Sequence, residues 1–300
     1  ANTTGTQGVA VGSLALNSNT TGENNTAVGY LAITTTTTGD NNTGIGQGAL
    51  RYNETADNNT AVGKDALRSN TTADNNTAVG KDSLKLNTTG TGNTAVGSEA
   101  LDANTTGSSN TAVGQKTLTT NVTGEYNTAL GFEALRNSTS ANSNTAIGYY
   151  AARATTSGVL NVAVGQGALQ NNTTGSSNTA VGQAALTTNT SGLDNTAVGK
   201  SSMVLNTTGK YNVAVGRQSL NSNTTADNNV AVGYHCLYTN TTGRDNTAVG
   251  TETLDANTTG DFNVAVGKAA LGSNTIGENN NAFGLGAGFN NTTGNANCFF

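Results

Sequence analysis

Gly-Lys pairs are the residues of this sequence whose type and spacing most resemble a catalytic or ligand-binding site. Such a pair ends the loop that cradles nucleotide phosphates, and Gly199-Lys200-Ser201 also has the hydroxyl residue that this loop needs. The loop further requires a glycine five residues earlier and a helix afterwards, but Asp194 stands at the glycine position and no helix is expected. The sequence therefore predicts no nucleotide site and no cofactor.

The single histidine and the two cysteines do not form a reactive set either. His235 has no partners at its level of the chain from which a hydrolytic triad or a zinc site could be built, so we assign it to a variable surface position. Cys236 is expected to be buried, and Cys298 lies too far along the chain to form a disulfide with it. We therefore predict that the protein is not an enzyme.

Acidic residues recur at one point of a repeated pattern, at Glu23, Asp40, Asp57, Asp74 and Asp227. A weak calcium column is one interpretation of this series. Other copies of the pattern carry Ser or another non-acidic residue at the same point, so solvated turn residues with Asx-turn hydrogen bonds are the better interpretation. No metal site is predicted.

Asn-Thr-Thr triplets supply repeated N-glycosylation sequons, and the same residues also suit a turn. Attached glycans would make this a glycoprotein, although glycans on stacked coils would lie only about 4.8 Å apart, which is very crowded. Both interpretations stay open. The candidate glycosylation residues are Asn2, Asn19, Asn70, Asn87, Asn104, Asn172, Asn206, Asn223, Asn240, Asn257 and Asn291, with variants such as Asn121 and Asn189.

All these residues belong to one pattern that repeats every 17 residues, N-T-A-V-G-x-x-A-L-x-x-N-T-T-G-x-x. A period of 17 is too short for a pair of helices, and the Gly, Thr and Val of each copy disfavour a helix. We predict an all-β parallel β-solenoid, or β-roll, of about 17 coils with two short strands and two corners per coil. It is expected to form a single continuous array over residues 1–300, cut from a longer chain, because neither end shows a cap.

Alternation along the T-A-V strand assigns its side chains to two faces. We place Val62 and Leu67 in the coil interior, because their equivalents are nearly always apolar. Ala61 must then point outward, and its small size favours a second buried face that packs against another chain. The alternative, a very thin roll with Ala61 inside and Val62 outside, stays open.

Gly63 and its equivalents are predicted to need positive φ or a close backbone approach. The asparagine that opens each copy is expected to stack into a hydrogen-bonded ladder along the array. This structural ladder begins with Asn25, Asn42, Asn59, Asn76 and Asn93.

The block N-T-A-V-G-x-x-A, at 25–32, 59–66 and 178–185, is similar to the S-V-A-I-G-x-x-A repeat of YadA-like heads in trimeric autotransporter adhesins. It resembles more closely the NTAVG-type repeats of phage and bacterial tail-fibre and surface-fibre proteins. The resemblance implies a left-handed parallel β-roll with three chains to a rod, presented at a cell or virion surface. The period of 17 is longer than the usual adhesin head repeat, and no membrane anchor, stalk or chaperone is recognised.

These observations lead to the hypothesis of an extracellular structural or adhesive fibre segment that self-associates into a homotrimer or filament. The alternative is a binding module for ice or glycans, although Thr71 and Thr72 are adjacent and so diverge, unlike the T-x-T of ice-binding faces. The net charge of −5 gives no basic patch for nucleic acid. No apolar run approaches the ~20 residues that membrane insertion needs.

Overall fold

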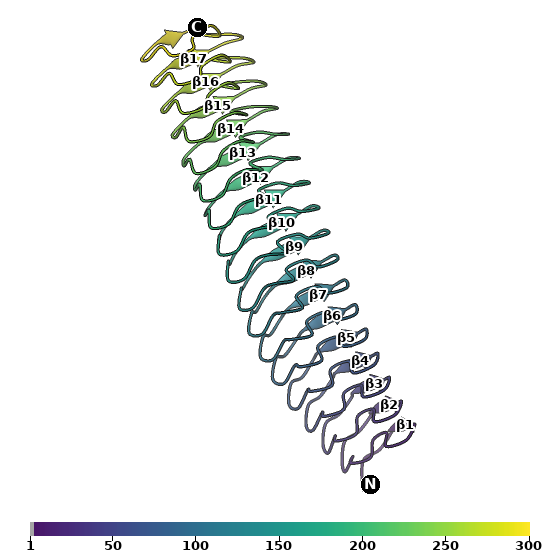
Figure 1. Cartoon of the computed structure of the whole chain (residues 1–300). Helices are drawn as coiled ribbons and strands as arrows, with labels where there is room; N and C mark the ends of the chain where they lie inside the picture. The colour runs from purple at the N-terminus through teal and green to yellow at the C-terminus, as the bar shows by residue number, and fades with distance from the viewer. Residues whose placement is uncertain (1–2) are drawn as a thin grey trace. The chain divides into compact units, whose positions relative to one another are not determined.

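The computed structural model describes residues 3–300, and the chain divides into two compact units, Ala1–Tyr149 and Tyr150–Phe300. Each unit is a stack of coils in which one short strand alternates with turns and bends (Figure 1). No helix able to cross a bilayer occurs in the described residues. Every element of the described residues is a strand, so both units are all-β.

Each coil contributes one strand to the sheet of its unit. The first unit contains β1 (Val9–Val11), β2 (Thr26–Val28), β3 (Thr43–Ile45), β4 (Thr60–Val62), β5 (Thr77–Val79), β6 (Thr94–Val96), β7 (Thr111–Val113), β8 (Thr128–Leu130) and β9 (Thr145–Ile147). The second unit contains β10 (Val162–Val164), β11 (Thr179–Val181), β12 (Thr196–Val198), β13 (Val213–Val215), β14 (Val230–Val232), β15 (Thr247–Val249), β16 (Val264–Val266), β17 (Asn281–Phe283) and β18 (Cys298–Phe299).

Within each unit, every strand pairs in parallel with the strand of the next coil. Thr60, Ala61 and Val62 of β4 pair with the residues 17 positions later in β5, so equivalent side chains stack in rows along the unit. We name each row after its member in the coil 59–75, for example the Val62 row. The predicted parallel β-solenoid with 17-residue coils is confirmed.

The prediction of two strands per coil is wrong. The segment that contains Ala66 and Leu67 is a run of turns, and Leu67 itself has φ of 48°. A residue in the left-handed region cannot continue a strand. Its backbone instead bonds along the stack, where Leu67 N donates to Ser83 O at 3.0 Å.

The strand faces are the reverse of the assignment that we favoured. The Ala61 row points into the coil and is fully buried from Ala27 to Ala282, whereas Val62 on the opposite face is only half-buried. The interior has no room for a larger strand residue, because Leu67 enters it from the turn side and is also fully buried. At Gly44, even a Cβ would lie 2.7 Å from Ile33 Cγ1. The thin roll with alanine inside is therefore the observed fold.

The glycine prediction is confirmed. Gly63 has φ of 134°, and a Cβ built on it would lie 2.5 Å from the carbonyl oxygen of Gly80 in the next coil. Both requirements, positive φ and a close backbone approach, hold from Gly12 to Gly267, and Gly284 has the positive φ alone. Gly90, in the other glycine row, has no positive φ, as expected for a row that also contains Ala73.

Three further positions of the coil have positive φ and mostly hold non-glycine residues, as at Asp65, Leu67 and Asn75. The Asp65 row contains Ala184 with φ of 58°. The left-handed conformation costs an L-residue roughly 1–2 kcal/mol of free energy. Ala184→Gly is therefore expected to stabilise the second unit by about 1 kcal/mol. Guanidinium unfolding of the purified protein measures the change.

Ala154→Gly is the matched control, since Ala154 lies in the same unit and has no positive φ. There the glycine only increases the freedom of the unfolded chain, so a loss of about 0.5–1 kcal/mol is expected. Equal effects of the two variants would show that the left-handed backbone carries no strain.

Candidate functional surface

The outward face of each sheet carries two rows and no charged residue. The Thr60 row holds threonine or valine, with Asn281 and Cys298 at its end, and the Val62 row holds Val, Ile, Leu or Phe. Members such as Val79 and Ile45 are 37% and 40% exposed. Apart from the exposed thiol of Cys298 at its end, this strand face offers only methyl groups, hydroxyls and the amide of Asn281, with no acid or base.

The asparagines of the predicted ladder lie inside the coil. Asn25 Nδ2 donates to Gly39 O at 2.7 Å, and Asn25 Oδ1 accepts the backbone N–H of Asn42 at 2.9 Å. The same backbone-to-side-chain bond links Asn42 to Asn59, Asn59 to Asn76, and Asn76 to Asn93. Direct amide-to-amide bonds also occur, as from Asn110 Nδ2 to Asn93 Oδ1 at 3.1 Å. The row therefore joins coils mainly through the backbone.

The sequon asparagines form a second interior row beside the first, since Asn42 and Asn53 both donate to Ala56 O. Asn70 Nδ2 donates to Asn53 Oδ1 and to Ala73 O, each at 2.9 Å. Most of the candidate glycosylation residues that the structure describes are buried: Asn19, Asn70, Asn87, Asn104, Asn172, Asn206, Asn223, Asn240 and Asn257. Asn291 is only half-buried. Asn2 lies outside the described residues. Sequence reasoning missed this second row, although its only substitutes, such as Thr36 and Ser138, are small hydrogen-bonding residues.

Burial predicts where glycans can sit on the folded chain. A glycan on Asn206 Nδ2 would replace its bonds to Asn189 Oδ1 and Gly209 O and could not fit inside the coil. Asn58-Asn59-Thr60 and Asn171-Asn172-Thr173 are also sequons, and their first asparagines are exposed. After secretion through a glycosylating host, we expect peptide mass spectrometry of folded protein to find glycans at Asn58 and Asn171 but not at Asn206. A glycan at Asn206 in folded protein would contradict the interior row.

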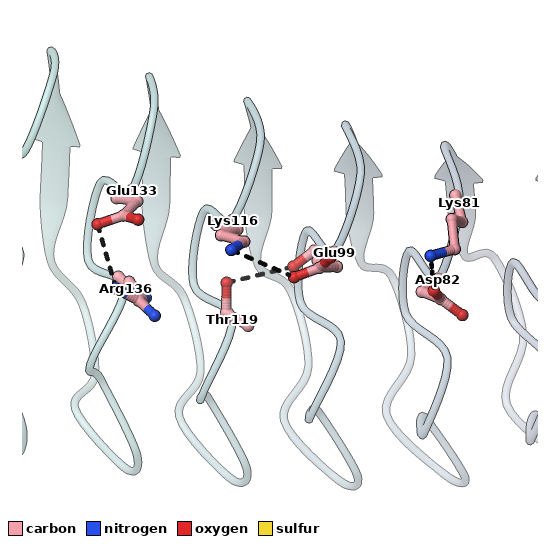
Figure 2. A network of polar contacts seen from close by, with 7 residues as sticks. All are labelled: Lys81, Asp82, Glu99, Lys116, Thr119, Glu133 and Arg136. Atoms are coloured by element: carbon pink, nitrogen blue, oxygen red, sulfur yellow. Dashed lines mark hydrogen bonds and ion pairs between the residues drawn. The ribbon is translucent and has the colours of Figure 1, made fainter.

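The turn side of the coils in the first unit carries a network of charged residues (Figure 2). Lys81 and Lys85 lie 3.3 and 3.1 Å from the carboxylate of Asp82. Burial raises the pKa of Asp82, but the two lysines outweigh it and the net pKa is lowered. The ammonium of Lys116 lies 3.9 Å from Glu99 on the preceding coil. These pairs are partly exposed, so each contributes at most about 1 kcal/mol.

Two further contacts complete this network. Arg136 lies 3.3 Å from Glu133 within one coil, and Thr119 Oγ1 donates to the backbone oxygen of Glu99 at 3.3 Å. Asp102, one coil beyond Lys85, has a raised pKa, chiefly because it is half-buried, and its Oδ1 atom has no hydrogen-bond partner. Of these ion pairs, only Lys116–Glu99 joins neighbouring coils, and the others lie within one coil.

The remaining candidate residues are separate from one another. Lys200 is exposed and is followed by turns. The acidic residues bond to backbone, as where Asp57 Oδ1 accepts the N–H of Asp40 at 2.7 Å. Cys236 is buried, donates to Ala248 O, and has a pKa raised to about 12 by burial. Residues 3–300 contain no pocket and no group of three metal-binding side chains.

The comparisons with known proteins add no family to this description. No protein-family model and no curated protein matches the chain.

Proposed function

We propose that the chain is a structural segment of an extracellular fibre and that it works by stiffness and self-association rather than catalysis. The single observation that carries the proposal is the uncharged outward face formed by the Thr60 and Val62 rows. Charged residues are depleted at the core of protein interfaces, and here they are absent from every strand of the described face. The partner is a second copy of the same chain, since the rows offer an identical repeat spacing on each copy.

The size of the face supports this proposal. Three strand residues span about 10 Å and successive coils rise about 4.8 Å, so the strands of one unit present roughly 400 Å². A patch of that size equals the largest patch on a typical monomer, which often has a function, and larger apolar patches mark interaction sites. Three copies per fibre and a place at a cell or virion surface follow from the resemblance to fibre repeats.

A lysine on the outward face tests self-association. Val79 and Val122 are 37% and 38% exposed, but Val79 lies on the sheet face and Val122 on a corner. We expect Val79→Lys to shift the mass measured by light scattering from oligomer towards monomer, because an unpaired charge would be buried between chains. Val122→Lys is expected to leave the mass unchanged. A wild-type chain that is monomeric at all concentrations would refute the proposal.

A water-ordering or ice-binding face is the second candidate function. The strand places Thr60 and Val62 on the same outward side, about 6.6 Å apart, with the next coil about 4.8 Å away. This T-x-V arrangement avoids the divergence of Thr71 and Thr72. Thermal hysteresis is measured for the monomeric Val79→Lys variant and for the wild-type chain. If neither protein shows hysteresis, this candidate is removed.

A further inference from the structure

The second unit carries one patch whose chemistry differs from that of the repeat. Three rows on the turn side hold Tyr234, His235 and Tyr238 in one coil. The same rows hold Lys200, Ser201 and Val204 two coils earlier, and Lys268, Ala269 and Gly272 two coils later. The aromatic group is therefore local.

The three rings form one stack. The centroids of Tyr234 and His235 are 4.0 Å apart with 14° between the planes, and those of His235 and Tyr238 are 4.5 Å apart with 20°. His235 Nε2 lies 3.0 Å from Gln218 Oε1 in the preceding coil, which fixes the imidazole between the two phenols. Tyr234 remains 40% exposed. The histidine thus holds two tyrosine rings in fixed positions at the surface.

Polar groups of different kinds flank this stack on its two sides. The preceding coil supplies Arg217, whose Cζ lies 5.9 Å from the centre of the Tyr234 ring, and Gln218. The following coil supplies Glu252 and Asp255. The Oδ1 atom of Asp255 is buried without a hydrogen-bond partner, and the pKa of Asp255 is raised, chiefly by burial. A guanidinium and an amide therefore lie on one side of the rings and carboxylates on the other.

We infer that this patch binds a neutral pyranose sugar of an oligosaccharide chain. The apolar C–H face of a pyranose packs on an aromatic ring, while its hydroxyl groups donate to carboxylates and accept from guanidinium and amide groups. Phosphates and acidic sugars are disfavoured by Glu252 and Asp255, and amines by Arg217. A surface patch without a pocket suits a sugar within an extended chain. The patch lies on the turn side, so self-association through the strand face leaves it accessible, and the inference does not rest on the proposed function.

The chain has a single histidine, so the His235 Hε1 proton gives one unambiguous NMR signal at the centre of the patch. The probes are maltohexaose and chitohexaose, which are neutral, and hexagalacturonate, which is acidic. We expect at least one neutral oligosaccharide to shift this signal along a saturable curve, and hexagalacturonate not to shift it. No shift with either neutral probe, or a shift with the acidic probe alone, would overturn the inference.

Variants assign the binding to the patch. Tyr234→Ala is expected to weaken the binding of the neutral oligosaccharide at least tenfold, and the isosteric Asp255→Asn several-fold. Tyr211→Ala is the matched control, because Tyr211 is 57% exposed in the same unit and lies outside the patch. Unchanged affinity in both patch variants would overturn the inference. The oligomeric mass of the same samples is measured separately, so failure of sugar binding and failure of self-association are distinguishable.

Discussion

Gly182→Ala is expected to destabilise the second unit by about 3 kcal/mol or more, from backbone strain together with steric overlap. Gly182 has φ of 135°, and an added Cβ would lie 2.6 Å from both the carbonyl carbon and the oxygen of Gly199. The backbone of Gly199 cannot withdraw easily, because its N–H donates to Val181 O at 2.8 Å within the stack. Guanidinium unfolding followed by circular dichroism measures the loss.

Gly167→Ala separates this effect from the general cost of replacing glycine. Gly167 has φ of 66°, and its Cβ would meet only Gln170 Oε1, at 3.2 Å. Ala184 occupies the same row one coil later, so the position accepts alanine. We expect a loss of no more than about 1–2 kcal/mol for this variant. If both variants lost the same stability, contact between the glycine backbones of adjacent coils would not be what restricts the Gly63 row.

The period and the invariant glycine were enough to predict the parallel solenoid and the close approach at Gly63. A fixed spacing of 17 residues leaves few ways to stack a chain, and a glycine that is never replaced indicates a backbone that a Cβ would disturb. Whether Ala61 or Val62 faces inward could not be read from alternation, because alternation separates two faces without saying which one is buried. Thr60 could have identified the exposed face, because it is polar and lies on the same strand face as Val62.

The second interior asparagine row and the left-handed turns depend on tertiary context. An Asn-Thr-Thr triplet suits a turn, a glycan site and a buried ladder equally well, and only the closed coil selects among them. Leu67 has low intrinsic preference for positive φ, so local propensity predicts a strand there. The bonds along the stack, such as Asp65 N to Gln47 O at 2.8 Å, hold this conformation in place. Glycines at equivalent positions, such as Gly48 and Gly288, were the available signal.

Asn178→Ala is expected to destabilise the second unit by about 2–4 kcal/mol, because it leaves buried backbone groups without partners and creates a small cavity. Asn178 Oδ1 accepts the backbone N–H of Asn195 at 3.1 Å, and Asn178 Nδ2 donates to Gly192 O at 2.8 Å. Alanine removes both bonds at once. Hydrogen exchange should show a faster exchange of the Asn195 amide, alongside the loss of stability in guanidinium.

Asn171→Ala is the surface control, since Asn171 is exposed, and we expect it to change stability by less than about 0.5 kcal/mol. A comparison between the two interior rows is more informative. The Asn59 row has no substitute from Asn25 onwards, whereas the Asn70 row accepts Ser138 and Thr155. The difference follows from the acceptor role: Asn178 Oδ1 receives a backbone N–H, whereas Asn189 Oδ1 receives the side-chain Nδ2 of Asn206 at 2.9 Å.

Losing a side-chain partner can be repaired by a change of rotamer or by a smaller hydroxyl residue, but a backbone N–H in a stacked coil cannot turn to another acceptor. Asn189→Ser should therefore cost clearly less than Asn178→Ser, although both remove an amide from the interior. If the two serine variants were equally destabilising, the bond to the backbone would not be the reason that one row is invariant and the other is not.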